Sequence, residues 1–274
     1  MTISLREKLM DFSVPKIMGI LNITPDSFYD GGRYNSKDKI QKQIEKMIIS
    51  GADIIDVGGY SSRPGAKDIS IEDELNRVIP AIEIIKQKFP KTIISIDTFR
   101  SRVASEAIIS GADIVNDISG GNLDSNMFKT VSKHKVPYIL MHMRGNPENM
   151  MSKTNYENLT KDICKYFSQR IDKAKSCGIN DIIIDPGFGF SKTTQQNYEL
   201  LNNLEFFKDF QVPIIIGVSR KSMIYKTLNT TPEKALNGSS VLHTIGLMKG
   251  ANILRTHDVK EAVECVKIVS QLNA

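Results

Sequence analysis

Several polar residues of this sequence come directly after short apolar runs, where they could bind a small molecule. The isoleucines Ile182–Ile184 lead into Asp185, which is followed by Pro186 and by Gly187 and Gly189. In parallel α/β proteins chemistry collects at the carboxyl ends of strands, so a carboxylate before a Gly-rich loop suits a binding site. A strand stop followed by a turn would explain this one stretch equally well. Other apolar runs end in the same way, and the full set is Asn22, Asp56, Asp97, Asn116, His142, Asp185, Lys221 and Arg255, with His257 just beyond.

The Asp and Asn members of this set favour recognition of a flat heterocycle that carries amide and amino groups. They supply paired acceptors and donors, and Asp185 could accept two parallel N–H bonds from an amidine-like edge. A single polar residue after a strand is often only a helix cap, but this many at equivalent positions need a further explanation. His142 also lies at a strand end, and we expect it to be structural.

The basic residues indicate an anion site. Arg220 and Lys221 follow one apolar run, Arg255 and His257 follow another, and Arg63 lies in a loop that could reach them. The guanidinium of Arg and the N–H groups at a helix N-terminus bind phosphate or pyrophosphate well. In addition, α/β barrels commonly bind phosphate beside their last two strands. A departing pyrophosphate would favour a divalent cation, with the neutral oxygen of Asn22 as a ligand. The sequence has no His/Cys cluster for zinc.

Eight short runs rich in Ile and Val must position these residues, and each is followed by a helical pattern. Their alternation predicts a (β/α)8 barrel, of the TIM-barrel type, as a single α/β domain over residues 1–274. An open doubly wound sheet is the alternative, but its G-x-G-x-x-G fingerprint is missing after the first strand. The expected strands are Lys16–Leu21, Asp53–Val57, Thr92–Ile96, Asp113–Val115, Tyr138–Met141, Asp181–Ile184, Pro213–Ile216 and Ile253–Leu254.

Two helix starts and two long loops can also be predicted. Apolar residues at helical spacing predict a helix over Asn155–Cys177 with Thr154 as its cap, and Pro232 is expected at the first position of a helix capped by Thr231. Loops of about Thr24–Asn35 and Tyr60–Ile69 are longer than a barrel needs, which is typical of lids or binding loops.

Composition restricts the function classes. The chain has 274 residues, of which 41% are hydrophobic and 24% charged, as in an ordinary globular enzyme. A net charge of +5 with alternating signs suits a small anionic substrate, and we expect no nucleic-acid partner. We expect no membrane span, and the charged N-terminus does not resemble a signal peptide. Three dispersed cysteines favour reduced thiols and a cytoplasmic location.

Seven segments match, in order, the motifs of the dihydropteroate synthase family. The resemblance covers essentially the whole chain and implies a (β/α)8 barrel that forms a homodimer. It also implies a transferase that joins 6-hydroxymethyl-7,8-dihydropterin pyrophosphate to 4-aminobenzoate, uses Mg²⁺ and belongs to a class of sulfonamide targets. The segments are Met18–Asp30, Asp56–Gly65, Ser95–Thr98, Asn116–Gly120, Asp185–Phe190, Gly217–Met223 and Arg255–Val259.

The same resemblance implies roles for individual residues. Catalysis would rest on Asp97, Lys221 and Asn22, with Asn22 as the Mg²⁺ ligand. The pterin would be held by Asp97, Asn116, Asp185, Lys221 and Phe190. The pyrophosphate would be bound by Ser62, Arg63, Arg255 and His257. The 4-aminobenzoate side would comprise Thr24, Pro25, Phe28, Pro64, Phe190 and Ser222. Ser62 stands where the family more often has Thr, and it keeps the hydroxyl.

Three other functions fit parts of the pattern. A methyltetrahydrofolate methyltransferase would share the heterocycle-binding residues but would not need the basic cluster. A Schiff-base aldolase would use Lys221, which would then need a desolvated setting. A non-catalytic pterin-binding paralogue would be expected to lose the first-loop sequence Thr24–Phe28 or the Ser62–Gly65 sequence, and both are present.

Overall fold

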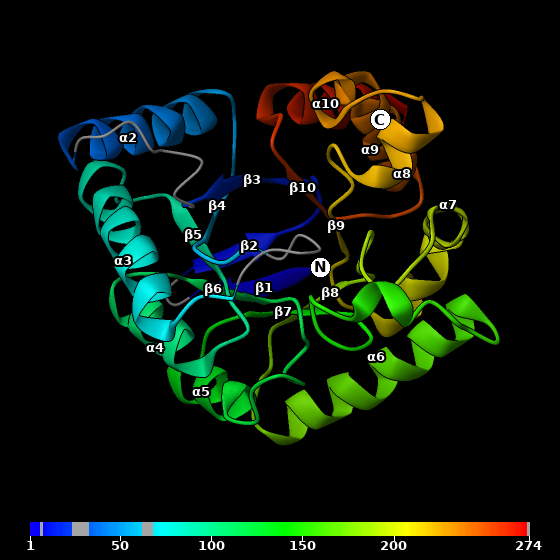
Figure 1. The fold of residues 1–274 in the computed structure, drawn as a ribbon, viewed down its shortest axis with the longest axis horizontal. Helices are drawn as coiled ribbons and strands as arrows, with labels where there is room; N and C mark the ends of the chain where they lie inside the picture. Colours follow the sequence, from blue (N-terminus) through cyan, green and yellow to red (C-terminus); the bar gives the residue numbers. More distant parts are fainter. Residues whose placement is uncertain (6–7, 24–32, 62–67, 273–274) are drawn as a thin grey trace.

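Eight parallel strands form a barrel inside a ring of helices in the computed structural model of the chain (Figure 1). The structure describes residues 1–5, 8–23, 33–61 and 68–272. Six residues with predicted roles lie outside this described part, namely Thr24, Pro25, Phe28, Ser62, Arg63 and Pro64. No helix among the described residues is both long enough and apolar enough to cross a bilayer.

All eight predicted strands are present, and each pairs with its neighbours in chain order. The sheet runs in the order β8-β7-β6-β5-β4-β3-β10-β9, and it closes through a parallel bridge between Ile184 and Ile214. This confirms the predicted barrel. The strands are β3 (Lys16–Asn22), β4 (Ile54–Gly58), β5 (Ile93–Asp97), β6 (Ile114–Asp117), β7 (Tyr138–Met141), β8 (Ile182–Asp185), β9 (Ile215–Ile216) and β10 (Ile253–Thr256).

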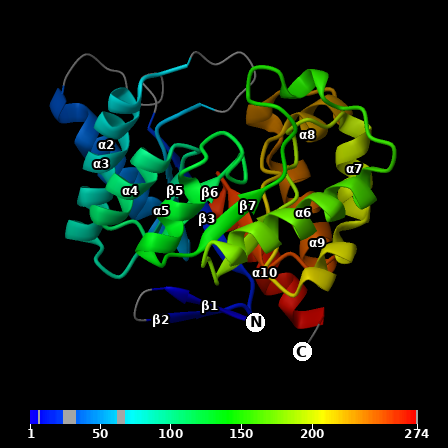
Figure 2. The ribbon, with the colours of Figure 1, turned by 90° about the horizontal axis from the view of Figure 1, so that it is seen from below.

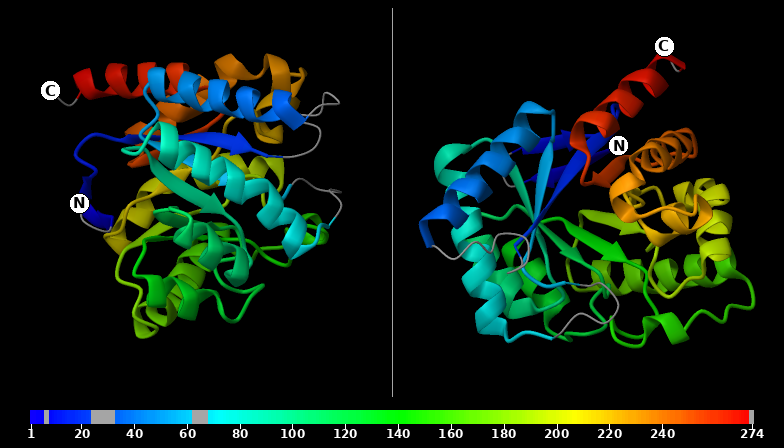
Figure 3. Two further views of the ribbon diagram at one scale, coloured as in Figure 1. Left: turned by 90° about the vertical axis from the view of Figure 1, so that its left-hand side faces the viewer. Right: turned by 45° about the horizontal axis from the view of Figure 1, so that its top comes forward.

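The helices surround the strands on all sides, as the tilted view on the right of Figure 3 also shows. They pack on an outer core of strand residues such as Leu21, Val57, Leu140 and Ile216. The helices are α2 (Arg33–Ile49), α3 (Ile71–Lys88), α4 (Ser101–Ile109), α5 (Met127–His134), α6 (Leu159–Ser176), α7 (Thr194–Asn202), α8 (Ser222–Thr227), α9 (Leu236–Met248) and α10 (Val259–Leu272), with short 3₁₀ turns η1 (Met150–Ser152), η2 (Leu204–Phe210) and η3 (Pro232–Lys234).

The barrel interior is layered, because alternate residues of a strand point to opposite faces. Each strand contributes one apolar residue to the lowest layer. Residues two positions further along each strand point into the next layer toward the mouth. The lowest layer consists of Met18, Ile54, Ile93, Ile114, Ile139, Ile183, Ile215 and Ile253.

An antiparallel hairpin, which the sequence analysis did not predict, covers the base of the barrel. Its strands are β1 (Thr2–Leu5) and β2 (Lys8–Asp11), and Figure 2 shows them below the barrel strands, at the lower edge of the view. Ile3, Leu5 and Met10 of the hairpin, and Phe12 directly after it, are buried against the lowest layer. The backbone N–H of Ser4 also donates to Asp181 at 2.9 Å. The hairpin therefore covers the apolar lowest layer at the amino end of the barrel, and the polar residues that follow the strands lie at the opposite end.

Two predicted helix starts were wrong for a common reason. Helix α6 begins at Leu159 and is capped by Asn158, because the carbonyls of Thr154 and Asn155 already accept bonds from Gln196 and Arg144. Likewise Pro232 begins only the 3₁₀ turn η3, and α9 begins at Leu236. There the carbonyls of Pro232 and Glu233 accept from Arg220 at 3.0 and 2.7 Å. The first predicted loop was also too long at its end, because α2 begins at Arg33.

Candidate active site

Apart from His142, the strand-end residues converge at the mouth of the barrel as predicted. Asp56, Asn116, Asp185 and Arg255 lie two positions beyond the lowest apolar layer, and Asn22 and Asp97 lie four positions beyond it. The strand alternation therefore turns all six side chains inward. Asp56, Asn116 and Asp185 are buried, which is rare for such residues unless they are paired or functional.

Arg255 of β10 binds two carboxylates on one side of this mouth. Its Nε donates to Asp56 Oδ2 and its Nη2 to Asp97 Oδ2, each at 2.7 Å. Asn116 Nδ2 also donates to Asp56 Oδ2 at 3.1 Å, while the buried Oδ1 of Asp56 has no partner among the described residues. Burial acts to lower the pKa of Arg255, but Asp56 and Asp97 outweigh it and raise the pKa above the ordinary value. Arg255 is therefore a fixed cation in a pocket of carboxylates.

Asp185, Lys221 and Phe190 form the other side. After Asp185 the chain turns sharply through Gly187, which has φ +75° and whose N–H donates to Asp185 Oδ1 at 2.8 Å. A Cβ at position 187 would lie 2.1 Å from the carbonyl oxygen of His142, so only glycine fits. Lys221 Nζ donates to the carbonyl of Phe188 and lies 4.8 Å from the ring centroid of Phe190.

Burial shifts the pKa values of these groups toward neutrality. It raises the pKa of Asp97 to about 7 despite the nearby Arg255, and it also raises that of Asp185 despite Lys221. Burial lowers the pKa of Lys221 to about 8, although Asp185 opposes the shift. Such convergent shifts in a concave site are typical of binding and catalytic groups. A desolvated lysine would also suit a Schiff base. The environment of Lys221 therefore does not distinguish a Schiff-base mechanism from a binding role.

Oxygen atoms of Asn22 and Asp97 face a common space beside Gly58. A Cβ built on Gly58 would lie 3.6 Å from both Asn22 Oδ1 and Asp97 Oδ2, and glycine leaves this space open. Two hard oxygen donors suit Mg²⁺, which keeps several waters and needs few protein ligands. Among the described residues no group of three or more His, Cys, Asp or Glu side chains could hold a metal ion. The residues present thus fit a Mg²⁺ that is also bound by substrate oxygens.

The remaining predicted residues lie at the rim, except Arg220. His257 is exposed, and its Nδ1 lies 3.2 Å from Ser219 Oγ. Ser222 begins α8, directly after Lys221. Arg220 was expected in the anion cluster, but its guanidinium forms two 2.8 Å bonds to Asp258. Arg220 therefore joins the two connections that follow β9 and β10, and the prediction that it belongs to the anion site was wrong.

His142 does not line the mouth, as expected for a structural residue. Tyr138 and Leu140 of the same strand point outward to the helices, and the alternation sends His142 the same way. Its ring packs edge-on against Tyr166, and its Nδ1 lies 3.0 Å from Nζ of Lys192. Lys192 is the main residue that the sequence analysis missed. Its position directly after the Gly-rich turn was only a weak indication of a role in the site, because the sequence does not show that Lys192 is buried.

The end of the second predicted loop is held by another missed residue, Arg100. Its guanidinium donates to Glu74, to Asp68 and to the carbonyl of Ile69, at 2.9, 2.9 and 2.7 Å. It also lies 5.3 Å from the ring of Tyr60, at the start of the same loop. Glu74 is buried, which raises its pKa. Arg100 therefore fixes both described ends of the loop beside the mouth.

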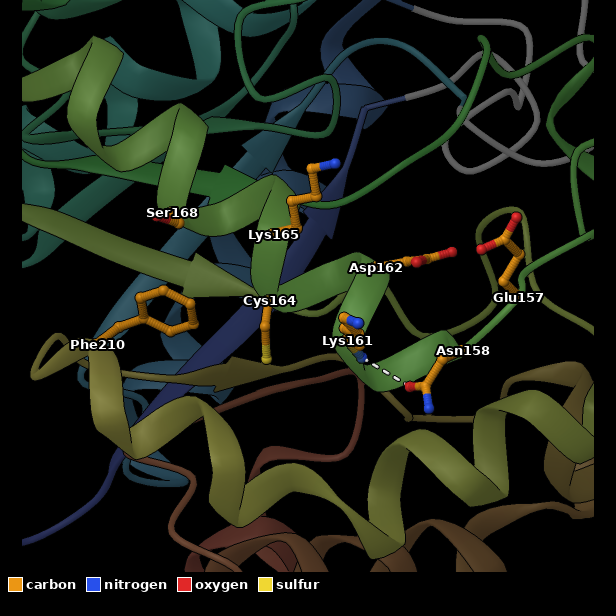
Figure 4. Close-up of a pocket in the computed structure, with 8 residues that line it drawn as sticks. All are labelled: Glu157, Asn158, Lys161, Asp162, Cys164, Lys165, Ser168 and Phe210. Atoms are coloured by element: carbon orange, nitrogen blue, oxygen red, sulfur yellow. Dashed lines mark hydrogen bonds between the residues drawn. The ribbon is translucent and has the colours of Figure 1, made fainter.

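A surface hollow elsewhere does not compete with the mouth as a site. It measures about 670 Å³ and lies along α6, facing Phe210 (Figure 4). Asn158 is occupied in capping α6, and Asp162 forms an ion pair with Arg144 at 3.0 Å. None of its lining residues comes from a strand end. We therefore assign the chemistry to the mouth.

Comparison with known proteins agrees with this geometry. A family model described as pterin binding enzyme matches residues 18–257. The dihydropteroate synthase of Escherichia coli K12 is 44% identical over 262 residues, which cover 95% of this chain and 92% of that protein. The dihydropteroate synthase of Clostridium beijerinckii is 47% identical over 255 residues, which cover 92% of each chain.

Solved structures are similar over nearly the full length. The Yersinia pestis dihydropteroate synthase, solved with a sulfonamide drug, has a TM-score of 0.93 and 40% identity, covering 100% of this chain and 99% of that one. The Xanthomonas albilineans dihydropteroate synthase, solved with 4-aminobenzoic acid, has a TM-score of 0.93 and 33% identity, covering 100% and 98%. These levels of identity extend the likeness from the fold to the enzyme family.

Proposed function

Since the chain belongs to the dihydropteroate synthase family and is a transferase, we propose that it joins 6-hydroxymethyl-7,8-dihydropterin pyrophosphate to 4-aminobenzoate. The products are 7,8-dihydropteroate and pyrophosphate. The observation that carries this proposal is the convergence of Asp56, Asp97, Asn116, Asp185 and Arg255 with Lys221 in one buried mouth. Carboxylates and an amide can pair with the pterin edge, and the cations lie beside them.

The proposed mechanism is a dissociative displacement. The bond between the pterin methylene and oxygen breaks, and its electron pair leaves with pyrophosphate. The amine lone pair of 4-aminobenzoate then forms the new C–N bond, and the amine loses a proton. Asp97 would stabilise the developing pterin cation, while Asp185 and Asn116 hold the ring and Lys221 donates to it. No activated nucleophile is needed, because an arylamine is already unprotonated at neutral pH.

The basic residues at the mouth and its rim would bind the pyrophosphate. Two of the five N–H donors of Arg255 go to Asp56 and Asp97 in this structure, and other donors of the fork can face the pyrophosphate. His257 would add a donor at the rim, together with Ser62 and Arg63. A Mg²⁺ held by Asn22 would neutralise charge on the leaving group. Phe190, Ser222, Pro64 and the Thr24, Pro25 and Phe28 segment would form the 4-aminobenzoate side, where sulfonamides would compete.

A pyrophosphate-release assay tests both the function and the mechanism. With Mg²⁺ and the pterin pyrophosphate alone, we expect slow release as water captures the cation, and 4-aminobenzoate should redirect the product to dihydropteroate. Removal of Mg²⁺ by EDTA should reduce the rate, and adding back excess Mg²⁺ is the control. Strict dependence of release on 4-aminobenzoate would contradict the dissociative order, and no release under any condition would contradict the synthase function.

We also propose that the chain forms a homodimer through α9 and α10. These helices lie side by side (Figure 1), and Val241, Ile245 and Met248 form an apolar stripe on α9 at helical spacing. Val241 and Met248 are 50% and 63% exposed, and Ile268 of α10 is 67% exposed. Light scattering should show a dimer for the unchanged chain and a monomer for Val241→Glu/Met248→Glu. Ile109→Glu on α4 is the control, and a dimer that survives the double substitution would contradict this interface.

A cytoplasmic location is proposed on the cysteines. Cys164, Cys177 and Cys265 are all free thiols in the structure, spread over α6, its end and α10. This pattern suits a reducing compartment. Cell fractionation should recover the synthase activity with cytosolic markers, and recovery outside the cytosol would contradict the proposal.

A further inference from the structure

Lys192 is buried behind the turn that carries Phe190. Its Nζ lies 3.0 Å from His142 Nδ1, 3.0 Å from the carbonyl of Gly187 and 3.1 Å from the carbonyl of Phe190. An ammonium has three donors and no acceptor, so these three partners match a charged lysine. Burial, followed by the charges of Lys192 and Arg144, keeps the pKa of His142 well below its usual value, which leaves the imidazole neutral and able to accept.

Two lysines hold the same four-residue turn from opposite sides. Lys221 donates to the carbonyl of Phe188 from the mouth, and Lys192 donates to the carbonyls of Gly187 and Phe190 from behind. Loss of either would release carbonyls of a turn whose glycines have φ +75° and +82°. The position of the Phe190 ring therefore depends on Lys192, which does not itself face the mouth.

The charge of Lys192 also acts on Asp185. Burial raises the pKa of Asp185, and Lys221, the Gly187 N–H, Arg255 and Lys192 all act to lower it. Burial lowers the pKa of Lys192 to about 7, helped by repulsion from Lys221 and Arg144 and opposed by Asp185. Below pH 7 Lys192 is thus mostly charged, and its charge then favours the ionised form of Asp185.

We propose that Lys192 is a positioning residue of the pterin site, which fixes the Gly187–Phe190 turn from behind and, through the bond from the Gly187 N–H, the Asp185 carboxylate as well. This inference rests on the proposed role of Asp185 in pterin binding. The charged groups that face the pair are Lys221 directly before α8, Arg255 on β10 and Arg144 after β7, with neutral His142 between Lys192 and the helices. A protonated Asp185 could no longer accept two N–H bonds from the pterin, so binding is lost as the pH falls through the pKa of Asp185.

Binding of 6-hydroxymethylpterin between pH 5 and 8.5 tests this inference in the full chain. In Lys192→Met the Asp185 carboxylate loses a cation, so its pKa rises and the acid midpoint of binding should move up by as much as about one pH unit. At pH values below the midpoint of the unchanged chain the affinity should fall by up to about tenfold, the change that one pKa unit represents. Lys192→Gln can still donate to a turn carbonyl, so it should recover affinity at pH 8 but keep the raised midpoint. Lys173→Met, an exposed site on α6, is the control and should match the unchanged chain.

The outcomes separate the two proposals. A Lys192→Met variant with unchanged affinity and acid midpoint would overturn this inference alone. Failure of both Lys192 variants to fold would also overturn it, because the residue would then serve the fold rather than the site. Absence of pterin binding by the unchanged chain would overturn the proposed function together with this inference.

Discussion

Replacement of Arg255 by methionine is expected to lower the free energy of unfolding by about 3–5 kcal/mol at pH 8.5, the typical cost of removing one partner of a buried ion pair. Asp56 and Asp97 would keep their negative charges without the guanidinium that joins them at 2.7 Å. Urea unfolding followed by circular dichroism measures the change. Arg102→Met removes an exposed ion pair to Glu72 and should change stability little.

The pH dependence of Arg255→Met gives a second test of the same cause. The folded-state pKa of Asp97, about 7, lies above its unfolded value, so its contribution to stability is present at low pH and is lost as the pH rises through 7. Without Arg255 this pKa rises further. The deficit of the variant should therefore shrink between pH 8.5 and 6 as Asp97 takes up a proton. A deficit that is constant with pH would show that Arg255 acts by packing rather than by charge.

The fold could be predicted from the sequence because each strand is a short β-branched run that must be buried on both faces. The same runs also show which residues point into the barrel, because every second residue of a strand lies on the same face. Asp185 therefore points the same way as Ile183, and Arg255 the same way as Ile253. Applied to β7, that period would also have turned His142 away from the mouth, because Ile139 and Met141 are the inward residues. The hairpin at the base escaped prediction because its strands are short and depend on a tertiary contact.

The pairing of charges could not be predicted in the same way. An Arg beside a strand end can bind a ligand or another part of the protein, and the sequence does not distinguish the two. Arg220 binds Asp258 and two carbonyls, while Arg255, at the same kind of position, lies between two carboxylates of the mouth. Lys192 was missed for the same reason, since only its burial reveals that it supports the turn.

Replacement of Lys221 by alanine is expected to lower kcat/KM for dihydropteroate formation by about 10²–10³-fold, the usual cost of removing a preorganised donor from an active site. The substitution removes the donor to the Phe188 carbonyl, the cation over Phe190 and the strongest charge that keeps the pKa of Asp185 down. Because each of these supports the pterin side, the apparent affinity for the pterin pyrophosphate should fall more than that for 4-aminobenzoate. The assay is release of pyrophosphate coupled to dihydropteroate formation.

The pattern of loss discriminates among the possible roles of Lys221. Lys226→Ala changes an exposed lysine on α8, the helix that begins directly after Lys221, and should retain full activity. A Lys221→Arg variant keeps a cation at the mouth, so partial recovery would indicate that charge is what the reaction requires there. A Schiff-base mechanism predicts instead that arginine is as inactive as alanine and that borohydride traps a substrate carbonyl on the unchanged chain. Unchanged activity in Lys221→Ala would contradict every role considered for this residue and would move the donor function to Arg255.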